Sequence, residues 1–371
     1  MLFSERKRAA ALAKKTAQPL AGAEQAQCAS RQDTQQQRLP PVAQALSQQP
    51  FAGAQAQPAP LLQLEQLTPH IAVIKNKTNV GVLRVQDKGA EQALYFIDSG
   101  NDAKTALEEL ALAERTYGAF SLKAVITTHS HADHSGGNSV LREKAGAKIW
   151  ASKGEAALME VPVLQSSLVY GGSPLQELTS PYLMAEPCAV DTIFPYEKEI
   201  QLSNCLSLRA VSLPGHYIDM AALVIHDKAV DKTVAFLADG ISGRNVIKRY
   251  WIQYVYDEGL FKQSLERIKS IQADFYIPGH GDMVTDIEGL VELNQLAVFE
   301  TEAMILDELK TPHTFEELLK AVADRNGIIL KVSQYELIGS TIRSYLSSLQ
   351  RENKVTYTIT ENCMRWQRIH A

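Results

Sequence analysis

Paired cysteines, long hydrophobic runs and an excess of positive charge are all missing from this sequence. Its four cysteines lie far apart (Cys28, Cys188, Cys205 and Cys363) and form no CxxC pair. Their spacing argues against a disulfide scaffold and a thiolate zinc knuckle, and it favours a reducing, cytoplasmic compartment. No apolar run approaches the roughly 18 residues that a membrane-spanning helix needs. The net charge of −5 gives no support for a polyanion-binding protein, which is usually basic.

The first 60 residues have few of the side chains that build a core. They hold 15 Ala and 12 Gln, two Phe and no Tyr or Trp, with Val42 as the single β-branched apolar residue. Such a segment cannot bury enough apolar area to offset its ordering entropy, so we expect a disordered leader over residues 1–60. The run Ala9–Ala13 is too short for the apolar core of a signal peptide. A solvated extension is therefore expected, with export and a transit-type or membrane-surface role as alternatives.

The whole chain of 371 residues is long enough for two domains, and 45% hydrophobic residues suffice for a large core. Short β-branched runs predict strands at Ile71–Ile74, Val80–Val85, Ala93–Ile97, Ala124–Thr127, Ile149–Ala151, Leu206–Ser212, Ala221–Ile225, Thr233–Leu237 and Phe275–Ile277. Helical spacing predicts helices over 104–116 and from about Leu260 to Ile271. Two strand-rich halves with helices between them indicate an α/β class fold, an α/β/β/α sandwich over residues 61–286.

Residues 287–371 have a different pattern. A helix is expected over 287–309, and two more open with capping boxes at Thr314…Glu317 and Ser333…Glu336. The apolar face of the last helix consists of Ile338, Ile342, Tyr345, Leu346 and Leu349. Two short strands, 354–358 and 364–369, then form a hairpin around Glu361-Asn362. Three helices and a two-stranded wing describe a winged-helix-like domain.

The stretch from Thr127 to Asn138 carries the chemistry. It reads TTHSHADHSGGN, and three His and one Asp fall within six residues. Burying them without a strong partner would be costly, so a metal ion is favoured over a solvated His-rich turn. In an extended loop His129 and His131 project to the same side and can share one ion. Asp133 and His134, where the backbone turns, can address a second ion.

Three more metal-competent side chains stand at strand ends, each beside a glycine. His216 follows the strand ending at Ser212, Asp239 the strand ending at Leu237, and His280 the strand ending at Ile277. Each alone is more typical of a capping or packing residue. Together with the first motif they form a strong pattern.

The HxHxDH motif and the later His, Asp and His resemble those of metallo-β-lactamase-fold hydrolases, over roughly residues 65–285. The resemblance implies that His129, His131 and His216 bind the first metal, that Asp133, His134 and His280 bind the second, and that Asp239 bridges both. It also implies that Asp98 orients the ligand loop, although a turn-capping Asp is the plainer interpretation.

Imidazole and carboxylate ligands suit two Zn²⁺, and Fe or Mn also fit. Two such ions would share a hydroxide, lower its pKa and use it as the nucleophile, with Asp133 and Asp239 in the catalytic centre. With two Zn²⁺ and one hydroxide the site would carry about +1, which favours a small, anionic substrate.

A bridging Asp239 is the pattern of glyoxalase-II-, lactonase- and phosphodiesterase-like members, and it argues against a true β-lactamase. Only 22 residues separate His216 from Asp239, which leaves no room for the inserted cassette of the RNA-processing branch. We therefore expect a cytoplasmic hydrolase of an ester, thioester or lactone. An iron-dependent persulfide dioxygenase stays open.

Two segments are expected to shape the pocket. Residues 159–187 predict a substrate-covering loop, with a dimer contact as the alternative. Residues 244–254 contain both cationic and aromatic side chains. This composition indicates equally well a place where a substrate tail enters and a salt-bridged helix with an aromatic face in the core.

The winged-helix-like tail suggests a rival function, a single-stranded RNA nuclease or another nucleic-acid-binding hydrolase. Residues 287–371 hold nine Lys and Arg against twelve Asp and Glu, and the last helix offers only Arg343 and Arg351. This is too little positive charge for strong phosphate binding. A wall of the active site or a homodimer contact is the expected role of the tail.

Overall fold

The computed structural model describes residues 62–86 and 91–369, so the predicted leader lies outside the described part. The described strands form two large sheets and one hairpin. In the first sheet the spatial order follows the chain: β1 (Gln63–Gln66), β2 (Ile71–Lys75), β3 (Val80–Val85), β4 (Ala93–Ile97), β5 (Ser121–Ile126), β6 (Lys148–Ala151) and β7 (Thr192–Ile193). Strands β1 to β4 pair antiparallel, and β4 to β7 pair parallel.

The second sheet has five strands. Their spatial order is β12 (Phe275–Pro278), β11 (Lys232–Ala238), β10 (Ala221–Asp227), β9 (Leu206–Ser212) and β8 (Glu199–Gln201). Only the β11–β12 pair is parallel. The carboxyl ends of these two strands therefore meet at one edge, where Asp239 and His280 follow.

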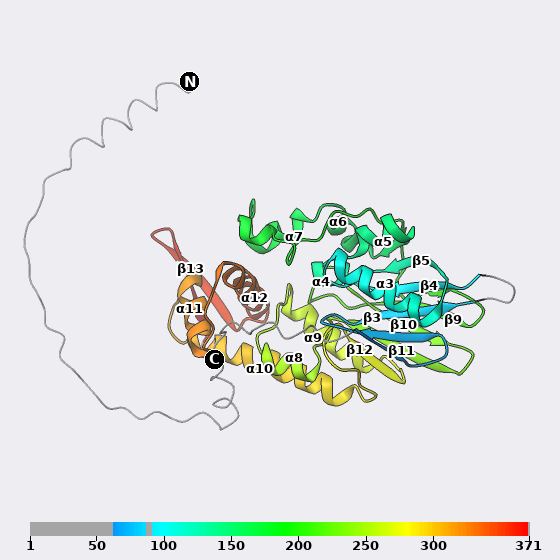
Figure 1. Ribbon diagram of the computed structural model, residues 1–371. Coiled ribbons are helices and arrows are strands. Elements are labelled where there is room, and N and C mark those ends of the chain that lie inside the picture. Colours follow the sequence, from blue (N-terminus) through cyan, green and yellow to red (C-terminus); the bar gives the residue numbers. More distant parts are fainter. Residues whose placement is uncertain (1–61, 87–90, 370–371) are drawn as a thin grey trace, which may run out of the picture. The chain divides into compact units, whose positions relative to one another are not determined.

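Helices cover the outer face of each sheet. Those between the strands are α3 (Ala103–Tyr117), α4 (Ala132–Ser135), α5 (Asn138–Ala145), α6 (Lys153–Glu160), α7 (Val163–Tyr170), the 3₁₀ helix η1 (Gln176–Thr179), α8 (Arg244–Arg249) and α9 (Glu258–Lys269). Figure 1 shows the layers in the order helices, sheet, sheet, helices. The α/β/β/α sandwich predicted from the strand pattern is confirmed.

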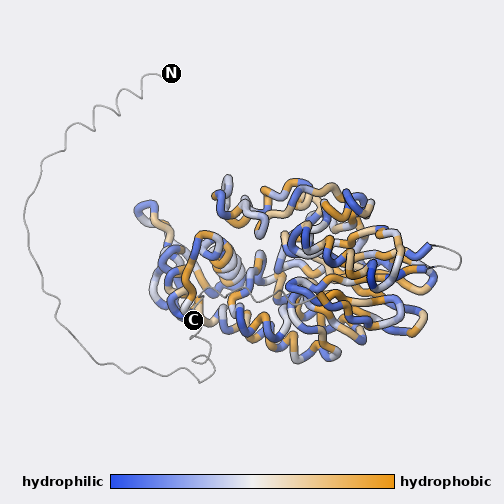
Figure 2. The backbone as a smooth tube through the Cα atoms, in the orientation of Figure 1, coloured by the Kyte–Doolittle hydropathy of each residue, from blue (hydrophilic) through white to orange (hydrophobic). Residues whose placement is uncertain are grey.

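Alternation along the strands fills the layers. In β2, Ile71 and Val73 pack between the sheets, whereas Ala72 and Ile74 face the helix layer. This is the period of two that a strand requires when both of its faces are covered. Figure 2 shows hydrophobic stretches running through the strands, with hydrophilic stretches at their connections.

The C-terminal residues form the helices α10 (Glu288–Glu308), α11 (Phe315–Arg325) and α12 (Val332–Arg351) and the hairpin β13 (Val355–Thr360) and β14 (Cys363–Arg368). The capping box of Thr314 and Glu317 is present. The capping box predicted at Ser333 is wrong, because Gln334 accepts from the Lys331 N–H (3.2 Å) and the helix begins at Val332.

The hairpin and the last helix match the prediction closely. Glu361 and Asn362 both take positive φ (52° and 63°), as a two-residue hairpin turn demands. One apolar cluster continues from β10 and β11 through α9 and α10 to α11 and α12. The boundary between 286 and 287 and the winged-helix assignment stay predictions.

A buried acid in α3 makes stability depend on pH. Glu109 is fully buried, its Oε1 accepts from Asn76 (3.2 Å), and its Oε2 has no partner. Burial raises the pKa of Glu109 from 4.5 to about 8. The protonated form is thus favoured in the folded state, and its stabilising contribution is lost as pH rises from about 4.5 to 8.

Glu109→Gln is therefore expected to raise the midpoint of thermal unfolding by about 2–4 °C at pH 8 and far less at pH 5. Differential scanning fluorimetry at both pH values measures this. Glu108→Gln is the matched control, since the neighbouring Glu108 is exposed. Equal shifts for Glu109→Gln at both pH values would show that the carboxyl ionises normally.

None of the helices in the described residues combines the length and the apolarity that crossing a bilayer requires.

Candidate metal centre

The predicted ligands come from loops at the carboxyl ends of strands. His129 and His131 lie after β5, and Asp133 and His134 lie on the short helix α4. His216, Asp239 and His280 follow β9, β11 and β12. Two residues near these ligands have strained backbones. Asp98, directly after β4, has a φ of 61°, and Ala238, directly before Asp239, has a φ of 47°. Such strain persists only where the surroundings enforce it, as they do at functional sites.

All seven predicted ligand residues come together in one cluster. Three groups within it have ligand atoms within 4.8 Å of one another: His129, His131 and His216; His129, His134 and Asp239; and Asp133, His134 and His280. The structure thus joins residues from four separate strand ends. Metal binding by each residue stays a prediction.

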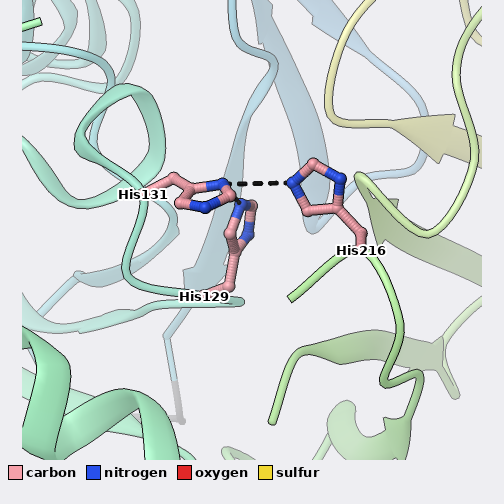
Figure 3. A group of neighbouring side chains, drawn as sticks. All are labelled: His129, His131 and His216. Atoms are coloured by element: carbon pink, nitrogen blue, oxygen red, sulfur yellow. Dashed lines mark hydrogen bonds between the residues drawn. The ribbon is translucent and has the colours of Figure 1, made fainter. Parts of the chain in front are cut away.

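The first group is built from converging imidazole nitrogens. Nδ1 of His131 lies 3.0 Å from Nε2 of His129 and 3.1 Å from Nε2 of His216, and Figure 3 shows the three rings pointing toward one another. A tetrahedral zinc ion with bonds of about 2.0–2.1 Å would space its ligands similarly. The donor set therefore fits a metal ion.

Burial keeps these three imidazoles neutral. It lowers the pKa of His129 and His216, and it lowers that of His131 to about 3, with further lowering from the neighbouring imidazoles. A neutral imidazole offers the nitrogen lone pair that a metal ion requires.

The other two imidazoles of the cluster, His134 and His280, have raised rather than lowered pKa values. Burial alone would lower the pKa of His134 and His280, but Asp239 and neighbouring carboxylates outweigh it and raise the values to about 10 and about 12. Nε2 of His280 lies 3.1 Å from Asp133 and 3.5 Å from Asp239. Positive charge is therefore stabilised between the two carboxylates.

His134 supplies a further sign that the cluster fits a metal. Its Nε2 is buried and makes no hydrogen bond, although Asp239 Oδ1 lies 3.4 Å away. Its Nδ1 lies 2.8 Å from Asp98, whose carboxylate also accepts from the N–H (2.8 Å) and hydroxyl (2.9 Å) of Thr128. The predicted orienting role of Asp98 matches this contact, since such partners fix the ring of a ligating His.

Glycines let the backbone pass close to the cluster. A Cβ on Gly279 would lie 2.3 Å from Asp239 Oδ1 and 2.8 Å from His134 Cε1. A Cβ on Gly137 would lie 2.3 Å from the Ser99 carbonyl oxygen. No side chain fits at either position.

Glu155, on α6, ties two ligand loops together and had no sequence signal. Its carboxylate accepts from the N–H (2.9 Å) and hydroxyl (2.6 Å) of Ser130, between His129 and His131. It also accepts from the N–H of Asp219 (2.9 Å), three residues after His216. The residue is fully buried, so the helix pattern alone could not separate it from a packing position.

A cavity of about 200 Å³ opens beside the cluster. Its lining consists of His131, Ala132, Asp133, Gln165, Ser166, Val169, Leu178, Tyr182, Leu183, His216, Tyr217, Asp239, Tyr254 and Leu337. The segment 159–187 contributes to this lining as predicted, but it forms α7 and η1 rather than a loop, because α7 and η1 pack on α12. Tyr254 was anticipated within 244–254, whereas Tyr217 and Leu337 were not.

Comparison with known proteins places the chain in a family. The sequence profile described as "Metallo-beta-lactamase superfamily" matches residues 76–280, more than half of the chain. The chain belongs to the metallo-beta-lactamase superfamily, and it is a hydrolase of this metal-dependent group.

Two curated relatives are distant. An atrochrysone carboxyl ACP thioesterase of Cryptosporiopsis sp. is 21% identical over 85% of this chain and 90% of its own length. Hydroxyacylglutathione hydrolase GloC of Haemophilus influenzae is 24% identical over 43% of this chain and 68% of its own length.

Solved structures share the fold. A beta-lactamase domain protein from Burkholderia ambifaria has a TM-score of 0.64 at 17% identity, covering 89% of this chain and 99% of that chain. A metallo-beta-lactamase family protein from Thermus thermophilus has a TM-score of 0.58 at 19% identity, covering 84% of this chain and 99% of that chain.

Proposed function

We propose that this protein is a dinuclear metal-dependent thioesterase that hydrolyses a small-molecule acyl thioester. The observation that carries the proposal is the cluster of five imidazoles and two carboxylates beside a cavity of about 200 Å³. One relative is named a thioesterase and the other a hydroxyacylglutathione hydrolase. These names favour a thioester over the ester or lactone that the sequence left open.

In this proposal His129, His131 and His216 would hold one Zn²⁺, Asp133, His134 and His280 would hold the other, and Asp239 would serve as a ligand to both. Zinc suits this nitrogen and oxygen donor set, and Fe or Mn fit it too. When bound, the ions supply a hydroxide nucleophile and polarise the carbonyl group of the substrate.

The side chains of the protein do the rest. Asp98 and the Lys77 carbonyl, which lies 2.6 Å from His280 Nδ1, hold His134 and His280 so that Nε2 of each faces Asp239. The leaving thiolate requires no general acid, because a thiol has a pKa of about 8.5.

No lysine or arginine lines the cavity within the described residues, so the cluster itself would have to attract an anionic substrate. The two arginines of α12, the last helix, are engaged within the protein. Arg343 lies over the ring of Phe315 (3.8 Å), and Arg351 pairs with Asp257 (3.1 Å). This disfavours the nuclease alternative. The cytoplasmic location and the homodimer stay part of the proposal.

The direct test combines metal analysis with thioester turnover. Protein purified without chelator is expected to contain about two transition-metal ions per chain and to release thiol from acyl-CoA and S-acylglutathione thioesters. Chelation should abolish release, and Zn²⁺ should restore it, since the ligands require the ion for chemistry. Less than about one metal equivalent, or oxygen uptake with a persulfide in place of thiol release, would contradict the proposal.

A further inference from the structure

The walls of the cavity are mostly apolar. Val169, Leu178, Leu183 and Leu337 contribute hydrocarbon side chains from α7, η1, the following segment and α12. Such a lining suits an acyl chain, which gains free energy as its apolar surface leaves water. In such an apolar lining, a polar atom without a hydrogen-bond partner requires the ligand to supply that hydrogen bond.

Two residues of this lining each have one buried side-chain polar atom without a hydrogen-bond partner. These atoms are Oε1 of Gln165 and the hydroxyl of Tyr217, whose residues are 4% and 1% exposed. Leaving such an atom unsatisfied destabilises the unliganded protein, because the atom has lost its bonds to water and gained none in return. A third polar residue of the lining, Ser166, differs because its hydroxyl donates to the Leu178 carbonyl (2.6 Å).

The free atom of Gln165 is an acceptor. Its Nε2 donates to the Ser130 carbonyl (2.8 Å), and a carbonyl only accepts, so the amide orientation is determined. Tyr217 can donate or accept. The Ser130 hydroxyl gives its proton to Glu155 and therefore cannot donate to Tyr217.

The unpaired hydroxyl of Tyr217 belongs to a residue that lies beside the candidate metal ligands. Its ring centroid lies 4.2 Å from that of His131, and it directly follows His216. A substrate group that reaches Tyr217 is therefore held beside the cluster.

We propose that Gln165 and Tyr217 bind one substrate group that both donates and accepts a hydrogen bond. Gln165 Oε1 accepts from this group, and the Tyr217 hydroxyl donates to it. A hydroxyl on the acyl chain or a secondary amide on the thiol carrier meets this requirement. The inference rests on the proposed thioesterase function and adds to it that the preferred thioester carries such a group within reach of Gln165 and Tyr217.

The test compares matched substrates on the metal-loaded enzyme. Straight-chain and 3-hydroxyacyl groups of equal length are each presented as CoA thioesters, which carry amides, and as thiophenyl esters, which carry none. Wild type is expected to prefer the hydroxyacyl group, or the CoA carrier, by about 10- to 100-fold in kcat/KM. The comparison between acyl groups tests for a bound hydroxyl, and the comparison between thiol carriers tests for a bound amide.

Tyr217→Phe keeps the ring and removes the hydroxyl, so it should reduce this preference to within a few-fold, with unchanged metal content and melting temperature. Gln165→Leu should do the same, and metal analysis controls for its lost bond to Ser130. Ser166→Ala is the matched control and should keep the preference, because its hydroxyl is already bonded within the protein.

Equal kcat/KM for all four substrates in wild type, or an unchanged preference in Tyr217→Phe, would overturn the inference. Calorimetric titration with 3-hydroxy acids and unsubstituted acids gives a readout that is independent of turnover. If the protein binds the hydroxy acid more tightly but hydrolyses no thioester, the proposed thioesterase function is wrong and the binding role of Gln165 and Tyr217 is retained. If it binds both acids equally and hydrolyses no thioester, both proposals are wrong.

Discussion

Asp239→Asn is expected to lower thioester hydrolysis by roughly 10³-fold or more, while the folded state is retained. The carboxylate lies 3.4–3.5 Å from the Nε2 atoms of His134, His216 and His280, so it is the one anion shared by both halves of the cluster. An amide has the same shape but no charge, and it cannot bridge two cations as a carboxylate does. Metal content per chain should fall together with kcat.

Asp231→Asn provides a matched control for this variant. Asp231 precedes β11 as Asp239 follows it, and its side chain is 95% exposed. The same chemical change there should leave both metal content and turnover as in wild type. Near-normal hydrolysis by Asp239→Asn would remove the bridging role from the proposal.

Gly279→Ala is expected to lower activity by about 10²-fold or more through one added methyl group. The new Cβ would lie 2.3 Å from Asp239 Oδ1 and 2.8 Å from His134 Cε1, distances that no real contact tolerates. His134 cannot yield freely, because Asp98 holds its Nδ1 at 2.8 Å. The variant should therefore displace Asp239 and lose metal, with little change in secondary structure by circular dichroism.

Gly172→Ala is the control for the glycine variant. A Cβ at Gly172 would meet only ring carbons of Tyr170 at 3.9 and 4.0 Å, which is ordinary contact. Wild-type metal content and kcat/KM in Gly279→Ala would mean that residue 279 does not press on the cluster.

Strands that pack on both faces were predictable because their apolar runs are local. Val80–Val85, Ala93–Ile97 and Leu206–Ser212 appear with the expected bounds. The short strand at the edge of the first sheet was not predictable in the same way: β7 has two residues, and pairing with β6 rather than composition makes it a strand. Ser333 failed as a cap because Gln334, two residues before Glu336, satisfies the helix start first.

The residues of the candidate site likewise fall into those that could be predicted from the sequence and those that could not. HxHxDH and the three strand-end residues could be singled out because His and Asp are rare, chemically distinct side chains, and their spacing is that of candidate metal ligands. Glu155 and Tyr217 could not be found, because an acid in a helix and a tyrosine after a histidine are common. Their importance comes from what they contact in the folded protein.

The sequence by itself determined the chemical character of the candidate site: imidazoles and carboxylates placed after β-branched strands, with few cysteines, predict nitrogen and oxygen ligands for a metal ion in a layered α/β fold. Only the tertiary structure decided the shape and polarity of the cavity. Gln165, Tyr217 and Leu337 come from distant parts of the chain and meet in one lining. The physical reason is that side-chain chemistry and strand periodicity are local properties, whereas an unpaired buried atom exists only once helices and sheets have packed.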